Sequence, residues 1–182
     1  MNRTMILLNG PSSAGKSTLS RHLQKKLRED NIESVIISID DYMVTDPKET
    51  IYEDDIFEIM PNMCCDVRSL LAKGQNVIVD HAITSERIYE MMMAAAKDGT
   101  IVTVKVTCDL EILRKREKER GDRCIGSAEA SMEYLWPKEG NDRRIDNGKI
   151  PVEENADKVK VYAVKAYSEK AFPKKRSERS RV

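Results

Sequence analysis

Residues 10–17, with the sequence GPSSAGKS, fit the spacing G-x-x-x-x-G-K-[ST] at every position. An apolar run over residues 4–9 precedes this loop, and an amphipathic helical pattern over residues 16–29 follows it. Glycines let the backbone curl so that successive N–H groups point inward at phosphate oxygens, and the start of a helix adds its positive dipole end. The motif in this setting predicts a binding site for a nucleoside triphosphate.

Two side chains of the loop have specific expected roles. Lys16 supplies a mobile cation for the outer phosphates, and the Ser17 hydroxyl is placed to ligate Mg²⁺. The expected cofactors are ATP and Mg²⁺, and ATP is preferred over GTP because the chain has no Asn-Lys-x-Asp base-reading motif. The predicted nucleotide-binding residues of the loop are Gly10, Pro11, Ser12, Ser13, Ala14, Gly15, Lys16, Ser17 and Thr18.

Strand and helix patterns alternate along the whole chain. Strands are expected at residues 4–9, 34–39, 76–79, 101–107 and 143–145. Helices are expected at residues 16–29, 51–73 with a break at Pro61, 85–97, 110–119 and 152–170. This alternation predicts an α/β fold, a P-loop NTPase of the small-kinase type with a five-stranded parallel sheet flanked by helices. Residues 1–172 are expected to form a single domain, followed by a basic, flexible tail at 173–182.

Composition limits the partners. The 182 residues carry 31 Lys and Arg against 31 Asp and Glu, so the formal net charge is zero, and we expect no nucleic-acid partner. No apolar stretch approaches the roughly 20 residues of a membrane span, and no signal peptide is evident, so we expect a cytoplasmic protein without a membrane partner. Oligomeric state is not readable from the sequence. Four cysteines are expected to stay reduced: Cys64, Cys65, Cys108 and Cys124.

Carboxylates follow two of the predicted strands. Asp40 directly continues the second apolar strand, at the edge where the sheet should face the phosphate loop, so we rank it first as the base that accepts a proton from a substrate hydroxyl. Asp41 is expected to point away or to cap the next segment. Asp80 ends the third strand and is a candidate for coordinating Mg²⁺ or binding substrate. His81 beside it is either a substrate contact or a structural residue.

A cationic cluster follows the fourth strand. Arg120 and Arg123 flank a Gly that breaks the preceding helix, and this position is where small kinases keep a closing lid. Arginines brought over a triphosphate neutralise the charge of the transferred group and exclude water. We expect an arginine-bearing lid at about residues 116–137. Glu117 and Glu119 interleave with the cations as surface salt bridges do.

The chain resembles the chloramphenicol phosphotransferase-like family of P-loop kinases. The resemblance rests on the segment ILLNGPSSAGKS at 6–17, on Ser38-Ile39-Asp40, on VIVD at 77–80, on VTCDLEILRKREKERGDR at 106–123 and on DNGK at 146–149. It implies ATP-dependent phosphorylation of a small-molecule hydroxyl, with the adenine near residues 146–149. Beyond the loop, the expected site residues are the catalytic Lys16, Asp40, Arg120 and Arg123, the nucleotide-binding Arg116, Asn147 and Gly148, and Asp80 with Ser17 for the metal.

The acceptor is left open by the sequence. Residues 42–63 should shape its pocket, but they are rich in charge, whereas a flat apolar antibiotic prefers an apolar, aromatic lining. A nucleoside, nucleotide-sugar or adenylylsulfate-type kinase on the same scaffold is an alternative, with Tyr42, Tyr52 or Phe57 available to stack on a base. A different alternative is a non-catalytic ATP-binding switch, in which the bound nucleotide controls a partner.

Overall fold

The computed structural model describes residues 1–44, 46 and 48–171, so the predicted tail at 173–182 lies outside the described residues. The elements follow the order β1 (Thr4–Asn9), α1 (Lys16–Glu29), β2 (Ser34–Ser38), a short 3-10 turn (Ile39–Tyr42), α2 (Glu53–Ala72), β3 (Asn76–His81), α3 (Glu86–Ala95), β4 (Thr100–Thr107), α4 (Leu110–Arg120), α5 (Ser127–Tyr134), β5 (Arg143–Asp146) and α6 (Val152–Ala171). No helix in this part of the chain is long and apolar enough to cross a membrane.

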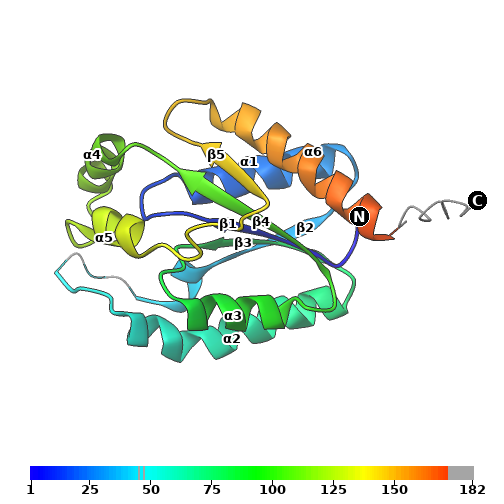
Figure 1. Cartoon of the computed structure of the whole chain (residues 1–182), viewed down its shortest axis with the longest axis horizontal. Helices are drawn as coiled ribbons and strands as arrows, with labels where there is room; N and C mark the ends of the chain where they lie inside the picture. The colour runs from blue at the N-terminus through cyan, green and yellow to red at the C-terminus, as the bar shows by residue number, and fades with distance from the viewer. Residues whose placement is uncertain (45, 47, 172–182) are drawn as a thin grey trace, which may run out of the picture.

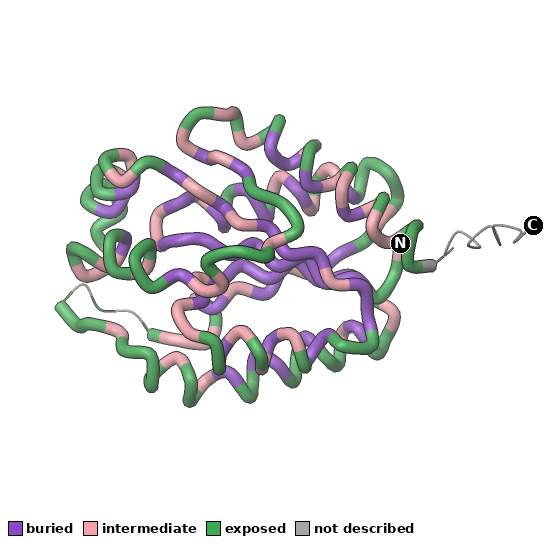
Figure 2. Tube along the Cα trace, viewed as in Figure 1, coloured by how far each residue is buried: buried purple, intermediate pink, exposed green. Residues whose placement is uncertain are grey.

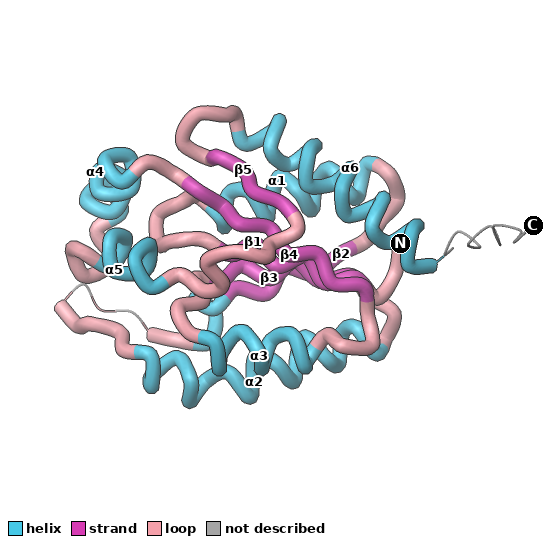
Figure 3. The backbone as a smooth tube through the Cα atoms, in the orientation of Figure 1, coloured by secondary structure: helices cyan, strands magenta, loops and turns pink. Residues whose placement is uncertain are grey.

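The strands form one parallel sheet in the order β2-β3-β1-β4-β5 (Figures 1 and 3), which confirms the predicted five-stranded parallel architecture. β1 lies at the centre, with β3 and β4 on either side of it. All of its residues are buried, because helices cover both faces of the sheet. In Figure 2 the central strands are buried along most of their length, whereas the helices on either side are buried only in part.

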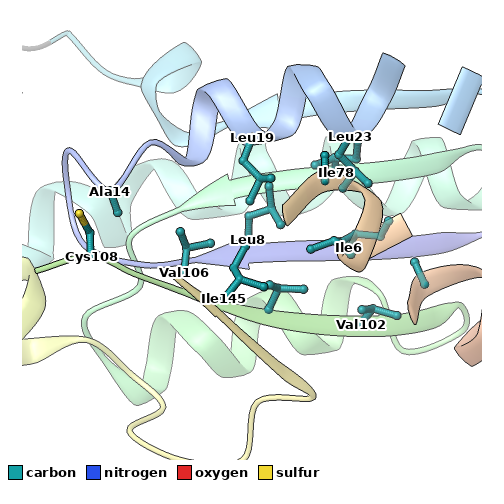
Figure 4. Packing of buried hydrophobic residues seen from close by; sticks show 14 of the residues in the cluster. Ile6, Leu8, Ala14, Leu19, Leu23, Ile78, Val102, Val106, Cys108 and Ile145 are labelled. Carbon is teal, nitrogen blue, oxygen red and sulfur yellow. The ribbon is translucent and has the colours of Figure 1, made fainter. Parts of the chain in front are cut away.

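Alternate residues of β1 serve two separate cores, as expected for a strand covered on both faces. Ile6 and Leu8 point to the side of α1 and α6, where they pack with Leu19 and Leu23 (Figure 4). Met5 and Leu7 belong to the other core, with the buried residues of α2 and α3. The first strand is therefore held in place from both sides, which fixes the point where the phosphate loop begins.

The expected break at Pro61 is wrong, because α2 runs without interruption from Glu53 to Ala72. Proline removes one backbone donor and leaves the carbonyl four residues earlier, that of Phe57, without its helical partner. Pro61 and Phe57 both lie on the exposed side of the helix, where water can solvate that carbonyl. Met60 and Met63 are buried against the sheet and keep the helix continuous.

The carboxyl ends of the parallel strands meet at one edge of the sheet, which is the edge where such folds bind ligands. The phosphate loop leaves β1 there, and α4 and α5 lie beside the same edge (Figure 1). The patterns along the chain did not predict α5, a short helix of low amphipathicity. It belongs to the segment 116–137, in which a lid was expected.

The start of the phosphate loop packs closely on the sheet, which gives a test of the fold. A Cβ at Gly10 would collide with the Val106 carbonyl oxygen and lie 3.0 Å from the Val106 Cβ. We expect Gly10→Ala to lower the free energy of unfolding by about 1–3 kcal/mol and to weaken ATP binding about tenfold. Urea unfolding and nucleotide titration measure the two effects.

Gly99→Ala is the matched control, since a Cβ there would collide with the Arg3 carbonyl oxygen at the opposite edge of the sheet. It should lower stability to a similar extent while the folded protein keeps its ATP affinity. Equal losses of ATP affinity in the two variants would contradict this interpretation.

Candidate active site

The phosphate loop joins β1 to α1. Ser13 and Gly15 adopt left-handed backbone conformations, with φ of 63° and 81°, which curls the chain between the strand and the helix. Gly15 is the N-cap of α1, and no side chain caps the helix there. The first turn also lacks an acidic residue. The first N–H groups of α1 therefore remain available to an anion, which the helix dipole also favours.

Lys16 lies inside the loop and is almost completely buried. Its ammonium donates a hydrogen bond of 2.9 Å to the Pro11 carbonyl and lies 4.0 Å from an Asp80 carboxylate oxygen. Burial lowers the pKa of Lys16, although the charges of Asp80 and Asp40 act in the opposite direction. The loop thus holds a cation in a desolvated position, where its attraction for a phosphate is strong.

Ser17 and Asp80 are in contact beside the phosphate loop. The Ser17 hydroxyl donates to the Asp80 carboxylate over 2.5 Å, and Asp80 is buried at the end of β3. In the described part of the chain no cluster of three or more His, Cys, Asp or Glu could hold a metal ion. Mg²⁺, however, needs only one or two protein ligands when substrate phosphates and water supply the others. One hydroxyl and one carboxylate at hydrogen-bond distance fit that requirement.

Asp40 follows β2 and faces two arginines. Arg123 donates to one carboxylate oxygen over 2.5 Å, and Arg120 donates to the other over 3.3 Å. Burial alone raises the pKa of Asp40, but the hydrogen bond and charge of Arg123, reinforced by Arg120, outweigh it and hold the pKa below its usual value. The carboxylate is therefore ionised at neutral pH and can accept a proton. The neighbouring Asp41 instead accepts a hydrogen bond from the Ser38 N–H and caps the turn, as expected.

The arginines lie on a turn between α4 and α5, which we define as the arginine turn, residues 120–126. α4 ends at Arg120 and is followed by Gly121 in the left-handed conformation, so the predicted helix break is present. The expectation that Glu117 is a surface residue is wrong. Glu117 is buried, and its carboxylate accepts from the N–H groups of Gly126 and Ala128 at 2.9 and 2.7 Å. Because those N–H groups lack partners within the helix, the Glu117 carboxylate caps the start of α5. The same bonds join α4 to the end of the arginine turn.

Arg116 and Asn147 lie against the phosphate loop at Ala14 and Gly15. Arg116 donates to the Asn147 carbonyl over 3.1 Å, and its guanidinium lies near Gly15. The Asn147 amide donates to the Ala14 carbonyl over 3.1 Å. Gly148 is closely packed, because a Cβ there would lie 3.1 Å from the Cys108 sulfur. The placement of an adenine beside residues 146–149 stays a prediction.

One cavity of about 970 Å³ brings most of the predicted residues together. Its lining includes Ser12, Ser13, Gly15, Lys16, Ser17, Thr18, Asp40, Asp80, Arg116, Arg120 and Arg123. The predicted residues outside the lining are three residues of the loop itself and two residues that follow β5: Gly10, Pro11, Ala14, Asn147 and Gly148. The sequence reasoning missed Arg21, Ser131 and Tyr134, which also line the cavity. Only the spacing of Arg21, one helical turn after Ser17, could have indicated its place.

His81 lies at the end of β3 in the wall of the same cavity and is fully buried. Its Nε2 is 3.4 Å from the Met60 sulfur, and its Nδ1 has no partner among the described residues. Burial, with the nearby charge of Lys16, lowers the pKa of His81 to about 4. The imidazole is therefore neutral at physiological pH and adds no positive charge to the site.

The fold and the cavity define a class, the P-loop nucleotide-binding domain of small kinases. A family model described as chloramphenicol phosphotransferase-like protein matches residues 3–164. The chain belongs to the chloramphenicol phosphotransferase-like family.

A curated relative is the L-seryl-tRNA(Sec) kinase of Methanococcus maripaludis, which is 33% identical over 123 residues. The match covers 65% of this chain and 47% of the relative, so this chain spans about half the length of that protein.

Solved structures share the fold. The APS kinase CysC of Mycobacterium tuberculosis, in complex with AMPPNP and APS, has a TM-score of 0.70 and 17% identity over 89% of this chain and 97% of its own. Kti12 of Chaetomium thermophilum, in complex with ADP-AlF3, gives 0.68 and 17%, covering 90% and 98%. A gluconokinase from Sinorhizobium meliloti 1021 gives 0.66 and 15%, covering 93% and 95%. At these identities the likeness establishes the fold.

The buried His81 predicts a pH-dependent stability. Between pH 6.5, its ordinary pKa, and pH 4, the unfolded chain binds a proton that the folded protein excludes, so the free energy of unfolding falls as the pH is lowered. We expect a loss of about 2 kcal/mol between roughly pH 7 and pH 5 from this group. Urea unfolding across this range should show a clearly weaker dependence in His81→Asn.

His22, the other histidine of the chain, provides the control, since it lies partly exposed on α1 beside Glu153. His22→Asn leaves His81 in place and should therefore retain the loss of stability that His81 causes between roughly pH 7 and pH 5. The same pH dependence in His81→Asn as in the parent would show that the buried imidazole is not its source.

Proposed function

We propose that this kinase transfers the γ-phosphoryl group of Mg·ATP to a hydroxyl group of a small molecule. The observation that carries the proposal is that one cavity contains the phosphate loop, an ionised carboxylate at a strand end and two arginines bound to that carboxylate. The two nucleotide complexes among the structural neighbours, CysC with AMPPNP and Kti12 with ADP-AlF3, support a nucleotide in this cavity.

In the proposed reaction Asp40 accepts the proton of the acceptor hydroxyl while the acceptor oxygen forms a bond to the γ-phosphorus. The bond from that phosphorus to the bridging oxygen breaks, and ADP leaves. Lys16 and the two arginines neutralise the charge on the transferred group, and the amides at the start of α1 hold the β-phosphate. Ser17 and Asp80 would hold Mg²⁺, which supplies further charge neutralisation at the phosphates.

The part of the cavity beside Asp40 is the proposed acceptor site. Ile39, Met43 and Ile56 line it with apolar surface. Tyr52, which is 68% exposed, and Tyr134, which is 61% exposed, also line the cavity and are free to contact a ligand. Among the three aromatic residues expected to stack on an acceptor, only Tyr52 lines it. Tyr42 instead donates to Asp66 over 2.6 Å, and Phe57 lies under the Arg87 guanidinium.

Serine esterified to a tRNA is the second candidate acceptor, favoured by the match to L-seryl-tRNA(Sec) kinase. Such an acceptor presents a primary hydroxyl at the end of a nucleic acid, so the expected absence of a nucleic-acid partner stays a prediction. An acceptor screen by ADP release separates the candidates when it includes antibiotic alcohols, nucleosides, sugars and seryl-tRNA. A nucleotide-dependent partner complex without any stimulating acceptor would favour the switch.

The role of Asp40 is tested by Asp40→Asn, which keeps the shape of the side chain but cannot accept the proton. Acceptor-stimulated ADP release should fall about 10²- to 10⁴-fold, while Mg·ATP affinity should stay within about threefold. Steady-state kinetics and nucleotide titration measure the two effects.

Asp41→Asn is the matched control, because Asp41 caps the same turn without lining the cavity. Its turnover should remain close to that of the parent. Equal activity of the two variants would exclude Asp40 as the base.

The proposed metal ligand is tested by Ser17→Ala. This variant should bind Mg·ATP about tenfold more weakly and bind ATP in EDTA as tightly as the parent protein, because only the metal contact is lost. Isothermal titration with and without Mg²⁺ measures the difference.

Ser20→Ala is the control on the same helix, since the Ser20 hydroxyl donates to the Ser17 carbonyl and lies outside the cavity. A parent-like affinity of Ser17→Ala for Mg·ATP would remove Ser17 from the metal site.

A further inference from the structure

Asn9 is a buried amide side chain at a critical position. It is the last residue of β1, immediately before the phosphate loop, and it is fully buried. Its register partners are His81 on β3 and Lys105 on β4. A buried amide needs hydrogen-bond partners on both its oxygen and its nitrogen, since an unmet group costs about 1–3 kcal/mol. The partners of Asn9 come from two distant segments.

The Asn9 side chain ties three parts of the chain together. Its oxygen accepts from the Ile83 N–H over 3.0 Å, and its nitrogen donates to the Trp136 carbonyl over 2.7 Å. The triangle closes because the Trp136 N–H donates to the Ile83 carbonyl over 2.8 Å. The side chain at this position must therefore accept a hydrogen bond from the Ile83 N–H and donate one to the Trp136 carbonyl. Asparagine meets this need, whereas the isosteric aspartate offers only acceptors.

Each residue of this triangle adjoins a part of the site. Asn9 immediately precedes the phosphate loop, Ile83 follows the end of β3 that carries Asp80, and Trp136 is the penultimate residue of the segment 116–137. A second contact fastens this segment to the loop, since the Ser12 N–H donates to the Ser131 hydroxyl over 2.9 Å. The arginine turn is thus held between α4 at one end and these contacts at the other.

We propose that Asn9 is a positioning residue that fixes the end of the segment 116–137 to the phosphate loop and so places Arg120 and Arg123 against Asp40. The inference rests on the proposed function. Asn9 itself is enclosed and touches no substrate. Misplacement of the arginines by about 1 Å is enough to reduce transfer by up to about 100-fold. A segment 116–137 that is held less firmly also admits water to the cavity, and this water competes with the acceptor for the phosphoryl group.

The test is Asn9→Asp, which keeps the bond from Ile83 but places a carboxylate oxygen against the Trp136 carbonyl. Acceptor phosphorylation should fall about 10- to 100-fold relative to ATP hydrolysis without acceptor, while ADP affinity stays within about threefold. Trp136 is the single tryptophan of the chain, so its fluorescence reports the detachment directly. Acrylamide should quench it more strongly in Asn9→Asp than in the parent protein.

Asn76→Asp is the matched control. Asn76 is a buried asparagine at the opposite end of the sheet, where its oxygen accepts from the Thr4 N–H and its nitrogen donates to the Met1 and Glu33 carbonyls. The substitution should cost comparable stability while leaving tryptophan quenching and the ratio of transfer to hydrolysis as in the parent. Asn9→Ser, which removes the amide without adding charge, gives the same test if Asn9→Asp does not fold.

The two readouts separate this inference from the proposed function. Parent-like quenching in a folded Asn9 variant overturns the tether, whatever acceptor the enzyme uses. Increased quenching with an unchanged ratio of transfer to hydrolysis overturns the positioning role. If no acceptor stimulates ADP release by the parent protein, the proposed function fails, and the quenching experiment still decides whether Asn9 holds the segment.

Discussion

The first turn of α1 presents backbone N–H groups that no side chain caps, and the rest of the site is arranged around this positive end. The central strand β1, packed on both faces, places the loop at the carboxyl edge of the sheet. Asp40 follows β2 and Asp80 lies near the end of β3, so both are at the same edge. The position of the site therefore follows from the parallel sheet, because the carboxyl ends of parallel strands lie at one edge.

The local charge of the cavity differs from the charge of the whole chain. Equal numbers of basic and acidic residues give a net charge of zero. The cavity nevertheless collects five basic side chains, Lys16, Arg21, Arg116, Arg120 and Arg123, against three acidic ones, Asp40, Glu53 and Asp80. Such a concentration attracts polyanions into a cleft even when the distant surface is neutral. Net charge therefore carries little information about the ligand of an enclosed site.

Sequence reasoning succeeded where a feature depends on neighbouring residues. The phosphate loop and the helix break at Gly121 are local, and the structure has them as predicted. The strand ends are shifted slightly, since β2 ends at Ser38 and Asp40 lies in the 3-10 turn that follows, while β3 continues past Asp80 to His81. Sequence reasoning failed for Pro61, where burial of the surrounding helix outweighed the intrinsic preference of proline. It also failed for Glu117, because the alternation of basic and acidic residues in α4 indicates a surface position, whereas the Glu117 carboxylate points inward and caps α5.

The tether around Asn9 was beyond sequence reasoning for a different reason. Its partners lie 74 and 127 residues away, so no local pattern could associate them. The same holds for Ser131, which reaches the loop from a helix that the periodicity did not reveal. Contacts of this kind depend on how the elements pack, and only the three-dimensional arrangement shows them.

The sheet ends in β5, a strand of four residues whose Arg143 and Arg144 are both exposed. Arg143 lies over the Tyr162 ring, 4.1 Å from its centre, which keeps the cation beside the edge. A bare strand edge invites a second molecule to add its own strand, and such pairing starts many aggregates. Two adjacent arginines on so short a strand would meet the same charges on an identical copy. Repulsion between these like charges disfavours strand pairing at this edge.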